Sequence, residues 1–315
     1  MTKLIRFEAS GTNHLGVDQG EYYVDVTRAY EGALRVGGVA NADQVAAAEL
    51  SSDALAFFEG GTRSLSALRT ALECVAAVSV EEGIASGYIV RAKDARLLVP
   101  LPNPRKIICV ARNFGKHAAE AGLPISDIPV LFPRFAATLI ANGDSIEIPP
   151  VSSQVDWEGE LAVVIGTGGR FIEKKNALDH VAGYTIFNDV TVRDYQFRVT
   201  QYTEGKNFST SGPIGPSITL LDEGLDPHDV RIVTTVNGVV KQDASTSEFI
   251  FDIPTIIQHI SEFIQLEPGD IIPMGTPAGV GFKRNPPEFL TAGDVVDITV
   301  EGLGTLRNPV VARTR

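Results

Sequence analysis

The chain has 315 residues, 44% of them hydrophobic, which is enough to bury a core in one large domain or in a small domain and a larger one. Lys and Arg number 27 and Asp and Glu number 39, so the formal net charge is 27 − 39 = −12. This acidic balance disfavours nucleic acid and anionic membranes as partners.

The two cysteines, Cys74 and Cys109, form no recognisable disulfide pattern, and Cys109 lies in an apolar run typical of a buried strand. The first residues lack the apolar stretch of a signal peptide, and no segment approaches the roughly 20 apolar residues that span a bilayer. These features predict a protein of the reducing cytoplasm.

The first hundred residues alternate short apolar runs with alanine- and leucine-rich stretches, and a proline-rich segment at residues 100–104 follows them. The pattern predicts strands at residues 4–7, 15–17, 22–26 and 88–99, helices at 45–58 and 65–78, and a hairpin turn at 18–21. We therefore expect a small α+β domain at residues 1–100 and a second domain at residues 101–315.

The second region is rich in β-branched runs and in glycine and proline turns. Strands are predicted at residues 161–165, 231–236 and 295–300, and a helix at 253–263. Asn237-Gly238 between two apolar runs is a strong hairpin signal. The chain has no internal repeat, so its second half is not a copy of the first. The expected fold class is α+β, mainly β.

Three acids interrupt apolar runs of this region. Glu158 and Glu160 are two residues apart, so on a strand their side chains would share one face, and Asp189 ends another apolar run. A pair of acids at a strand end is also common on solvated faces. If the three converge, their mutual repulsion favours a divalent ion, and carboxylate oxygens suit Mg²⁺, Mn²⁺ or Ca²⁺ better than zinc.

An ordered series of motifs resembles the fumarylacetoacetate hydrolase family over roughly residues 104–310. The motifs are KIICVARNF at 106–114, PVLFPR at 129–134, DWEGEL at 156–161, NDVTVRD at 188–194, GKNF at 205–208, GPIGP at 212–216 and GTPAGVG at 275–281. The chain is most similar to the branch of acylpyruvate hydrolases and 2-hydroxyhepta-2,4-diene-1,7-dioate isomerases. This resemblance implies a mixed β-roll body, a homodimer, and Mg²⁺ or Mn²⁺ held by Glu158, Glu160 and Asp189.

The resemblance also implies roles for single residues. His117 and Glu120 would form the acid–base pair, and on a helix their spacing places them on one face, although a surface histidine beside a surface glutamate is the simpler interpretation of the residues alone. Lys206 would stabilise negative charge on a substrate oxygen, or else only balance the acids. Substrate contacts are implied for a further set: Arg112, Arg134, Gln196 and Thr276.

Two positions depart from the family pattern, in which tyrosine often stands where this chain has Phe114 and lysine where it has Arg134. The first change removes a hydroxyl and the second replaces a point charge by a planar fork. Both are expected near the substrate, so they bear on substrate identity. The glycine-rich segment 275–281 lacks the lysine of a phosphate-binding loop.

The leading functional hypothesis is a hydrolase that cleaves the carbon–carbon bond of a 2,4-dioxo acid of the acylpyruvate or fumarylpyruvate type, in aromatic-compound catabolism. The His117 and Glu120 pair favours hydrolysis because a water must be activated. The same scaffold also hosts tautomerisation or decarboxylation of 2-oxo acids, by a 2-hydroxymuconate-type isomerase or an oxaloacetate decarboxylase. A third possibility is a non-catalytic metal-binding scaffold.

Overall fold

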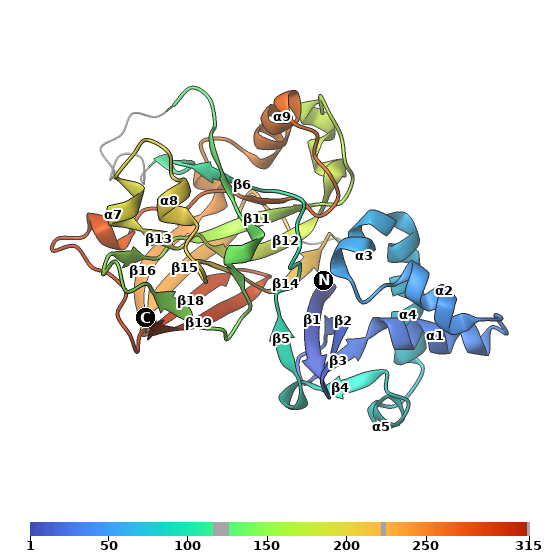
Figure 1. The fold of residues 1–315 in the computed structure, drawn as a ribbon. Coiled ribbons are helices and arrows are strands. Elements are labelled where there is room, and N and C mark those ends of the chain that lie inside the picture. Colours follow the sequence, from blue (N-terminus) through green and yellow to red (C-terminus); the bar gives the residue numbers. More distant parts are fainter. Residues whose placement is uncertain (116–125, 222–224, 314–315) are drawn as a thin grey trace.

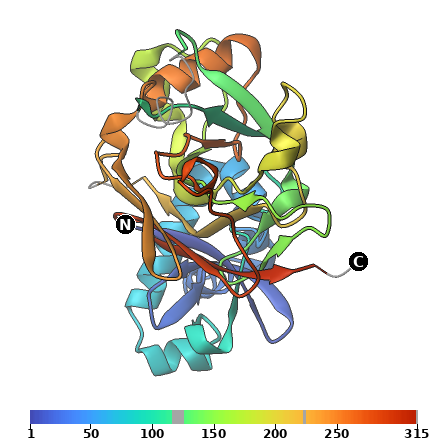
Figure 2. The same cartoon turned by 90° about the vertical axis from the view of Figure 1, so that its left-hand side faces the viewer.

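The computed structural model describes residues 1–115, 126–221 and 225–313. The helices of the N-terminal region gather on one side of the molecule, and a β-rich body with a second sheet and a few further helices lies on the other (Figures 1 and 2). The N-terminal elements are β1 Lys3–Ala9, β2 Thr12–Asp18, β3 Tyr22–Asp25, α1 Val26–Val36, α2 Ala42–Glu49, α3 Ala54–Gly60, α4 Thr62–Ala76, α5 Val80–Ala85, β4 Ile89–Arg91 and β5 Arg96–Leu98.

Most of the expected N-terminal elements are present, including the turn at residues 18–21, where the Gln19 N–H donates to the Tyr22 carbonyl at 3.0 Å. Three expectations were wrong in detail. Helices α1 and α5 were not predicted, the stretch 45–58 is broken into α2 and α3, and the stretch 88–99 is two strands separated by a turn of 3₁₀ helix. Short acids cap two of these helices: at the start of α1, Asp25 accepts from the Arg28 N–H, and at the start of α3, Asp53 accepts from the Leu55 N–H.

The remaining strands form the body. They are β6 Ile107–Ala111, β7 Val130–Arg134, β8 Leu139–Ile140, β9 Ile146–Ile148, β10 Val155–Asp156, β11 Gly159–Ile165, β12 Val181–Asn188, β13 Thr191–Val192, β14 Gly212–Leu220, β15 Arg231–Val236, β16 Val239–Ser245, β17 Ile271–Pro273, β18 Val295–Val300 and β19 Gly304–Ala312. The helices are α7 Arg193–Gln196, α8 Thr203–Lys206 and α9 Ile253–Phe263.

A twelve-stranded sheet runs through both regions, with β1 hydrogen-bonded to β14 of the body. The order along its main path is β4-β3-β2-β1-β14-β12-β11-β17-β6-β7, and a separate five-stranded sheet has the order β16-β15-β18-β19-β9. One hydrophobic cluster contains Leu15 and Phe57 of the N-terminal region together with Phe187 of the body. The first hundred residues thus share a sheet and a core with the rest, and the domain boundary stays a prediction.

Strand β11 lies in the interior of this sheet, between β12 and β17, and all its residues are buried. Leu161 and Val163 pack in the cluster that includes Ile298 of the five-stranded sheet, whereas Ala162 and Val164 pack in the cluster that includes the N-terminal helices. A strand covered on both faces is apolar throughout, which explains the uninterrupted run. Any charged side chain at its end is therefore drawn into a buried environment.

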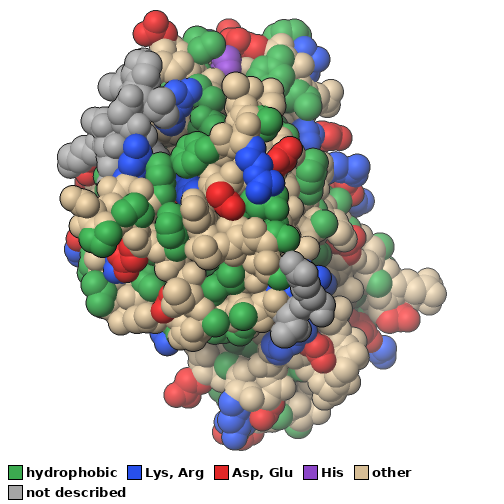
Figure 3. Space-filling model, turned by 60° about the vertical axis from the view of Figure 1, so that its left-hand side comes forward, with side chains coloured by type: hydrophobic (Ala, Val, Ile, Leu, Met, Phe, Trp, Pro, Cys, Tyr) green, Lys and Arg blue, Asp and Glu red, His purple; other side chains and the backbone are tan. Residues whose placement is uncertain are grey.

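The Asn237-Gly238 hairpin is confirmed: both residues have positive φ, 54° and 76°, between β15 and β16. On the face shown in Figure 3, acidic and basic side chains are interspersed among hydrophobic ones. Among the helices of the described residues, none has both the length and the apolar character needed to cross a bilayer.

Candidate active site

Three buried acids converge beside the adjacent ends of β11 and β12. The two strands are antiparallel with Gly159 opposite Asn188, so Asp189 comes to lie next to Glu158, and its N–H donates to the Glu158 carbonyl at 2.9 Å. Oxygen atoms of Glu158, Glu160 and Asp189 all lie within 4.8 Å of one another. The side chains from two separate runs of the sequence therefore form one group, as the sequence pattern predicted.

Burial and like charge act together on this group. Burial raises the pKa of Glu160 well above its usual value, and the charges of Asp189 and Glu158 raise it further. Such a trio is costly in a buried site unless positive charge lies close to it. The protein itself supplies three cations for this purpose, each on a different segment.

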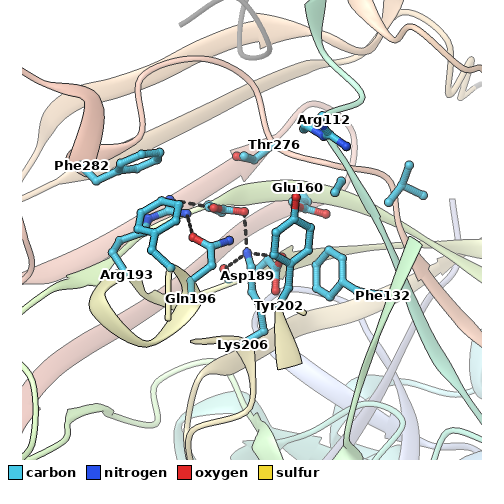
Figure 4. A pocket seen from close by; sticks show the side chains of 14 residues that line it. Arg112, Phe132, Glu160, Asp189, Arg193, Gln196, Tyr202, Lys206, Thr276 and Phe282 are labelled. Atoms are coloured by element: carbon cyan, nitrogen blue, oxygen red, sulfur yellow. Dashed lines mark hydrogen bonds and ion pairs between the residues drawn. The ribbon is translucent and has the colours of Figure 1, made fainter. Parts of the chain in front are cut away.

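Lys206, at the end of α8, is one of these cations, and only 2% of its side chain is exposed. Its Nζ lies 2.8 Å from Glu158 Oε2 and 2.5 Å from Asp189 Oδ2, and it also donates to the Asp189 carbonyl at 3.1 Å (Figure 4). Burial alone would lower the pKa of Lys206, but Asp189 and Glu158 outweigh it and the pKa is raised. The residue is a buried ammonium held against two of the acids.

Arg134 of β7 is the second cation. Its guanidinium forms a buried ion pair with Asp189 and donates to the Ser211 carbonyl and hydroxyl, each at 2.6 Å. It is absent from the residues that line the cavity described below, so its predicted contact with the distal end of a substrate is not supported. The planar guanidinium, with more donors than a lysine ammonium, instead binds the Asp189 carboxylate and the segment around Ser211.

Arg193 of α7 is the third cation, and its role was not predicted. Its Nε donates to Asp156 at 2.8 Å, its Nη2 lies 2.7 Å from Glu158 Oε1, and its Nη1 donates to Gln196 Oε1 at 2.9 Å. The Phe282 ring covers its guanidinium at 4.2 Å. A charge in the apolar run DWEGEL, namely Asp156, was the available signal that a buried cation would be needed nearby.

The segment that follows β17 closes another side of the site. The Gly275 N–H donates to Glu160 Oε2 at 2.9 Å, and the Thr276 hydroxyl donates to the Gly159 carbonyl at 3.0 Å. Gln242, which is buried and was not predicted, donates to the Thr276 Oγ1 at 2.7 Å. The Thr276 hydroxyl proton is thus already committed to the backbone, so a contact between Thr276 and substrate would use its remaining lone pair.

These groups surround a cavity of about 80 Å³. Its lining residues are Val110, Ala111, Arg112, Phe132, Glu158, Glu160, Asp189, Arg193, Gln196, Phe197, Tyr202, Lys206, Thr276 and Phe282. Four of the lining residues are aromatic, and the amide nitrogen of Gln196 points toward the centre of the cavity (Figure 4). The cavity therefore combines a charged floor with apolar sides, which is typical of a small-molecule site.

Among the residues with expected roles, seven line the cavity: Arg112, Glu158, Glu160, Asp189, Gln196, Lys206 and Thr276. Phe114 does not line it, because its ring is buried and packs on Phe249 with centroids 4.9 Å apart. His117 and Glu120 lie outside the described residues. Their expected role as the acid–base pair stays a prediction.

The residues present fit a hard divalent cation. All three acids are buried and offer only oxygen, and burial together with the charges of Asp189 and Glu158 raises the pKa of Glu160. Lys206 and the two arginines approach Glu158 and Asp189, whereas Glu160 accepts a hydrogen bond from the neutral backbone N–H of Gly275. A divalent ion between the three acids would supply the missing positive charge.

Gly275 lets this segment approach Glu160. Its φ is +96°, and a Cβ there would lie 3.0 Å from both the Val110 carbonyl oxygen and the Asn113 Cβ. We expect Gly275→Ala to push its N–H away from Glu160, and so to weaken metal binding by roughly 10- to 100-fold, because this hydrogen bond orients a ligand. Calorimetric titration with Mn²⁺ would measure this; the exposed Gly11→Ala, also at positive φ but with no atom within 4 Å, is the control.

The fold and the site together define an enzyme-like centre in which buried carboxylates and cations share a cavity. The family model described as "Fumarylacetoacetate (FAA) hydrolase C-terminal" matches residues 106–311. The chain belongs to the fumarylacetoacetate hydrolase family, as the motifs predicted. Enzymes of this family are typically dependent on a divalent metal, which agrees with the acid trio.

Two curated relatives are named as oxaloacetate tautomerases. The mitochondrial protein of Xenopus laevis is 39% identical over 257 residues, 81% of this chain and 77% of that protein. The protein YisK of Bacillus subtilis (strain 168) is 42% identical over 227 residues, 71% of this chain and 75% of that protein. The predicted cytoplasmic location is not tested by these matches, since vertebrate relatives carry a mitochondrial description.

Solved structures bear other names. A fumarylacetoacetate hydrolase from Exiguobacterium antarcticum has a TM-score of 0.78 and 34% identity, covering 99% of this chain and 100% of that one. A 2-hydroxyhepta-2,4-diene-1,7-dioate isomerase from Mycobacterium marinum has a TM-score of 0.72 and 30% identity, with both chains fully covered. The family and the fold are therefore established, and the reaction has to be argued from the site.

Proposed function

We propose that this protein is a divalent-metal-dependent tautomerase that interconverts the keto and enol forms of a small 2-oxo dicarboxylic acid such as oxaloacetate. The observation that carries this proposal is the placement of Lys206 against Glu158 and Asp189 in a cavity that also contains Arg112. The names of the relatives agree with the tautomerase reaction. This replaces carbon–carbon hydrolysis as the leading hypothesis.

Charge supports a dianionic substrate. Four carboxylates, those of Asp156, Glu158, Glu160 and Asp189, are matched by four cations, Arg112, Arg134, Arg193 and Lys206. A bound divalent ion would leave an excess of two positive charges. A dicarboxylate with two negative charges would balance it, and this complementarity favours such a substrate over a neutral ketone.

Tautomerisation needs charge stabilisation on one oxygen and a proton carrier for one carbon. A Mg²⁺ or Mn²⁺ ion held by Glu158, Glu160 and Asp189 would withdraw electrons from the 2-oxo group and favour the enolate. The Lys206 ammonium is placed to stabilise negative charge on an oxygen beside these acids, and Gln196 offers its amide N–H groups to orient the substrate. His117 and Glu120 are the predicted proton carriers.

The test is to supply the Mg²⁺- or Mn²⁺-loaded protein with enol oxaloacetate and follow the loss of the enol absorbance. We expect ketonisation well above the rate with metal alone, with little release of pyruvate. No acceleration would reject the proposal. Acetylpyruvate and fumarylpyruvate in parallel reactions would test hydrolysis, whose products are pyruvate and a second acid.

Hydrolysis of a 2,4-dioxo acid is the second candidate, favoured by the similarity over the whole chain to a structure named as a fumarylacetoacetate hydrolase. Ca²⁺ would serve as a substitute ion in either reaction. A non-catalytic scaffold is disfavoured because a buried lysine and a small cavity are not needed to store a metal. The homodimer implied by the family resemblance stays a proposal that sedimentation would test.

His117→Ala should separate proton transfer from metal binding. We expect turnover to fall roughly 100- to 10,000-fold, since general acid–base catalysis contributes about this much, while the affinity for Mn²⁺ stays unchanged. Steady-state kinetics and calorimetric titration would measure the two effects. His228→Ala is the matched control, because His228 does not line the cavity and is not one of the converging acids. A parallel loss of metal affinity in His117→Ala would contradict the assigned role.

A further inference from the structure

Arg112 has an uncommon backbone conformation for an arginine. It directly follows β6 with φ of +56°, in the left-handed region that a residue with a Cβ enters only at a cost in free energy. Such strain persists only where surrounding contacts impose it, and it is often found at functional sites. Contacts with the surrounding structure must therefore hold Arg112 in this conformation.

The Arg112 side chain is directed to the cavity. It lies beside Glu160 and Thr276, on the opposite side from Arg193 and Phe282 (Figure 4). Its Nε is buried and has no hydrogen-bond partner among the residues that the structure describes. In contrast, each of the other three cations of the site is paired with a carboxylate. Arg112 is thus the cation with capacity for an anionic ligand.

The adjacent Asn113 is completely buried and binds two other segments. Its Nδ2 donates to the carbonyls of Phe251 and Met274, at 3.0 and 2.9 Å, and its Oδ1 accepts from the Phe251 N–H at 2.8 Å. Its own carbonyl accepts from the Ile250 N–H at 2.7 Å. These hydrogen bonds, from the side chain and from the backbone carbonyl of Asn113, fix the backbone immediately after Arg112.

We propose that Arg112 selects substrates with a second carboxylate, and that Asn113 is the positioning residue that holds Arg112 in its left-handed conformation toward the cavity. The inference rests on the proposed function for the 2-oxo acid end of the ligand. It adds that the distal end of the substrate is recognised by the Arg112 guanidinium. The direction of this side chain is set by the hydrogen bonds that the buried Asn113 amide makes to the segments around Phe251 and Met274.

Binding tests the selection directly. Calorimetric titration of the Mg²⁺-loaded protein with oxaloacetate and with 2-oxobutanoate, which has no second carboxylate, gives the ratio of the two dissociation constants. We expect the wild type to prefer the dicarboxylate, and Arg112→Ala to reduce the preference roughly 10- to 100-fold, as for the loss of a charge-assisted hydrogen bond. Arg112→Gly should do the same without lowering the unfolding temperature, because glycine tolerates positive φ.

Asn113→Ala alone should reduce the preference for the dicarboxylate. Added to Arg112→Ala, it should reduce the preference no further, because the two substitutions remove the same interaction. Asn308→Ala is the matched control: Asn308 is also buried and donates to two carbonyls, those of Ala141 and Asp144, in the five-stranded sheet region. It should destabilise the fold and leave the preference intact.

Several outcomes would overturn the proposal: equal binding of both acids by the wild type, equal weakening of both in Arg112→Ala, or a loss of preference in Asn308→Ala as large as in Asn113→Ala. If Asn113→Ala does not fold, the Arg112→Gly and Arg112→Ala ratios still decide the role of Arg112. A preference for the dicarboxylate without any ketonisation would instead reject the proposed tautomerase reaction and leave this inference standing.

Discussion

Replacing Glu160 by glutamine should lower the affinity for Mn²⁺ or Mg²⁺ by more than about 100-fold, a larger effect than the roughly 10- to 100-fold usual for residues that only orient a ligand. The amide can still accept the hydrogen bond from the Gly275 N–H, so the local backbone should be retained. The variant without metal should be at least as stable as the wild type, because the change removes a charge that burial and two neighbouring acids disfavour.

Thermal unfolding with and without metal would measure both effects. In the wild type, an ion at 100 times its dissociation constant adds about 2.7 kcal/mol to the free energy of unfolding, and this increment should vanish in Glu160→Gln. Glu301→Gln, in the exposed turn between β18 and β19, is the control and should keep the increment. If metal stabilised Glu160→Gln as much as it stabilises the wild type, the ion would have to bind elsewhere.

The affinity for metal should also depend on pH. Binding requires the ionised carboxylate, and the pKa of Glu160 is raised, so the affinity should fall as the pH falls through that raised pKa and recover above it. Glu160→Gln has no proton to lose at this position, and this part of the pH dependence should therefore be missing. Titrations at several pH values would detect the difference.

The sequence predicted the acids of the site because local rules determine their placement. Glu158 and Glu160 lie at the start of β11, and Asp189 follows β12, which pairs with β11, so a single antiparallel contact brings the three together. The helix at residues 253–263 and the Asn237-Gly238 turn were likewise predicted from short-range signals, namely helical periodicity and an Asn-Gly pair that tolerates positive φ. Such elements can be predicted because the residues that determine them lie close together in the chain.

Lys206 was expected near the acids, but the contacts of the two arginines with them could not be predicted in the same way. Arg134 reaches Asp189 across 55 positions, and Gln242 reaches Thr276 across 34, so these pairs depend on how segments far apart in the chain pack together. Arginine is usually solvated, and nothing in residues 129–134 distinguishes a guanidinium that holds a carboxylate from one that contacts a substrate. That ambiguity led to the unsupported substrate role for Arg134.

Lys206→Met should have the opposite signature to Glu160→Gln. Methionine fills a similar volume but removes the cation that lies 2.8 Å from Glu158 and 2.5 Å from Asp189, and breaking a buried ion pair by removing one partner costs about 3–5 kcal/mol. The metal-free variant should therefore unfold at a lower temperature than the wild type. Added Mg²⁺ or Mn²⁺ should restore much of the loss, because the ion replaces the missing positive charge.

Turnover should not be restored with stability. The Lys206 ammonium is assigned to an oxygen of the substrate, and loss of one such donor typically lowers the rate by about 100- to 1,000-fold. Lys174→Met is the matched control, since Lys174 pairs with Asp252 at 2.9 Å on the surface, where ion pairs contribute little. If metal restored both the stability and the turnover of Lys206→Met, Lys206 would be only a counter-ion for the acids, and the division of labour between lysine and metal would have to be abandoned.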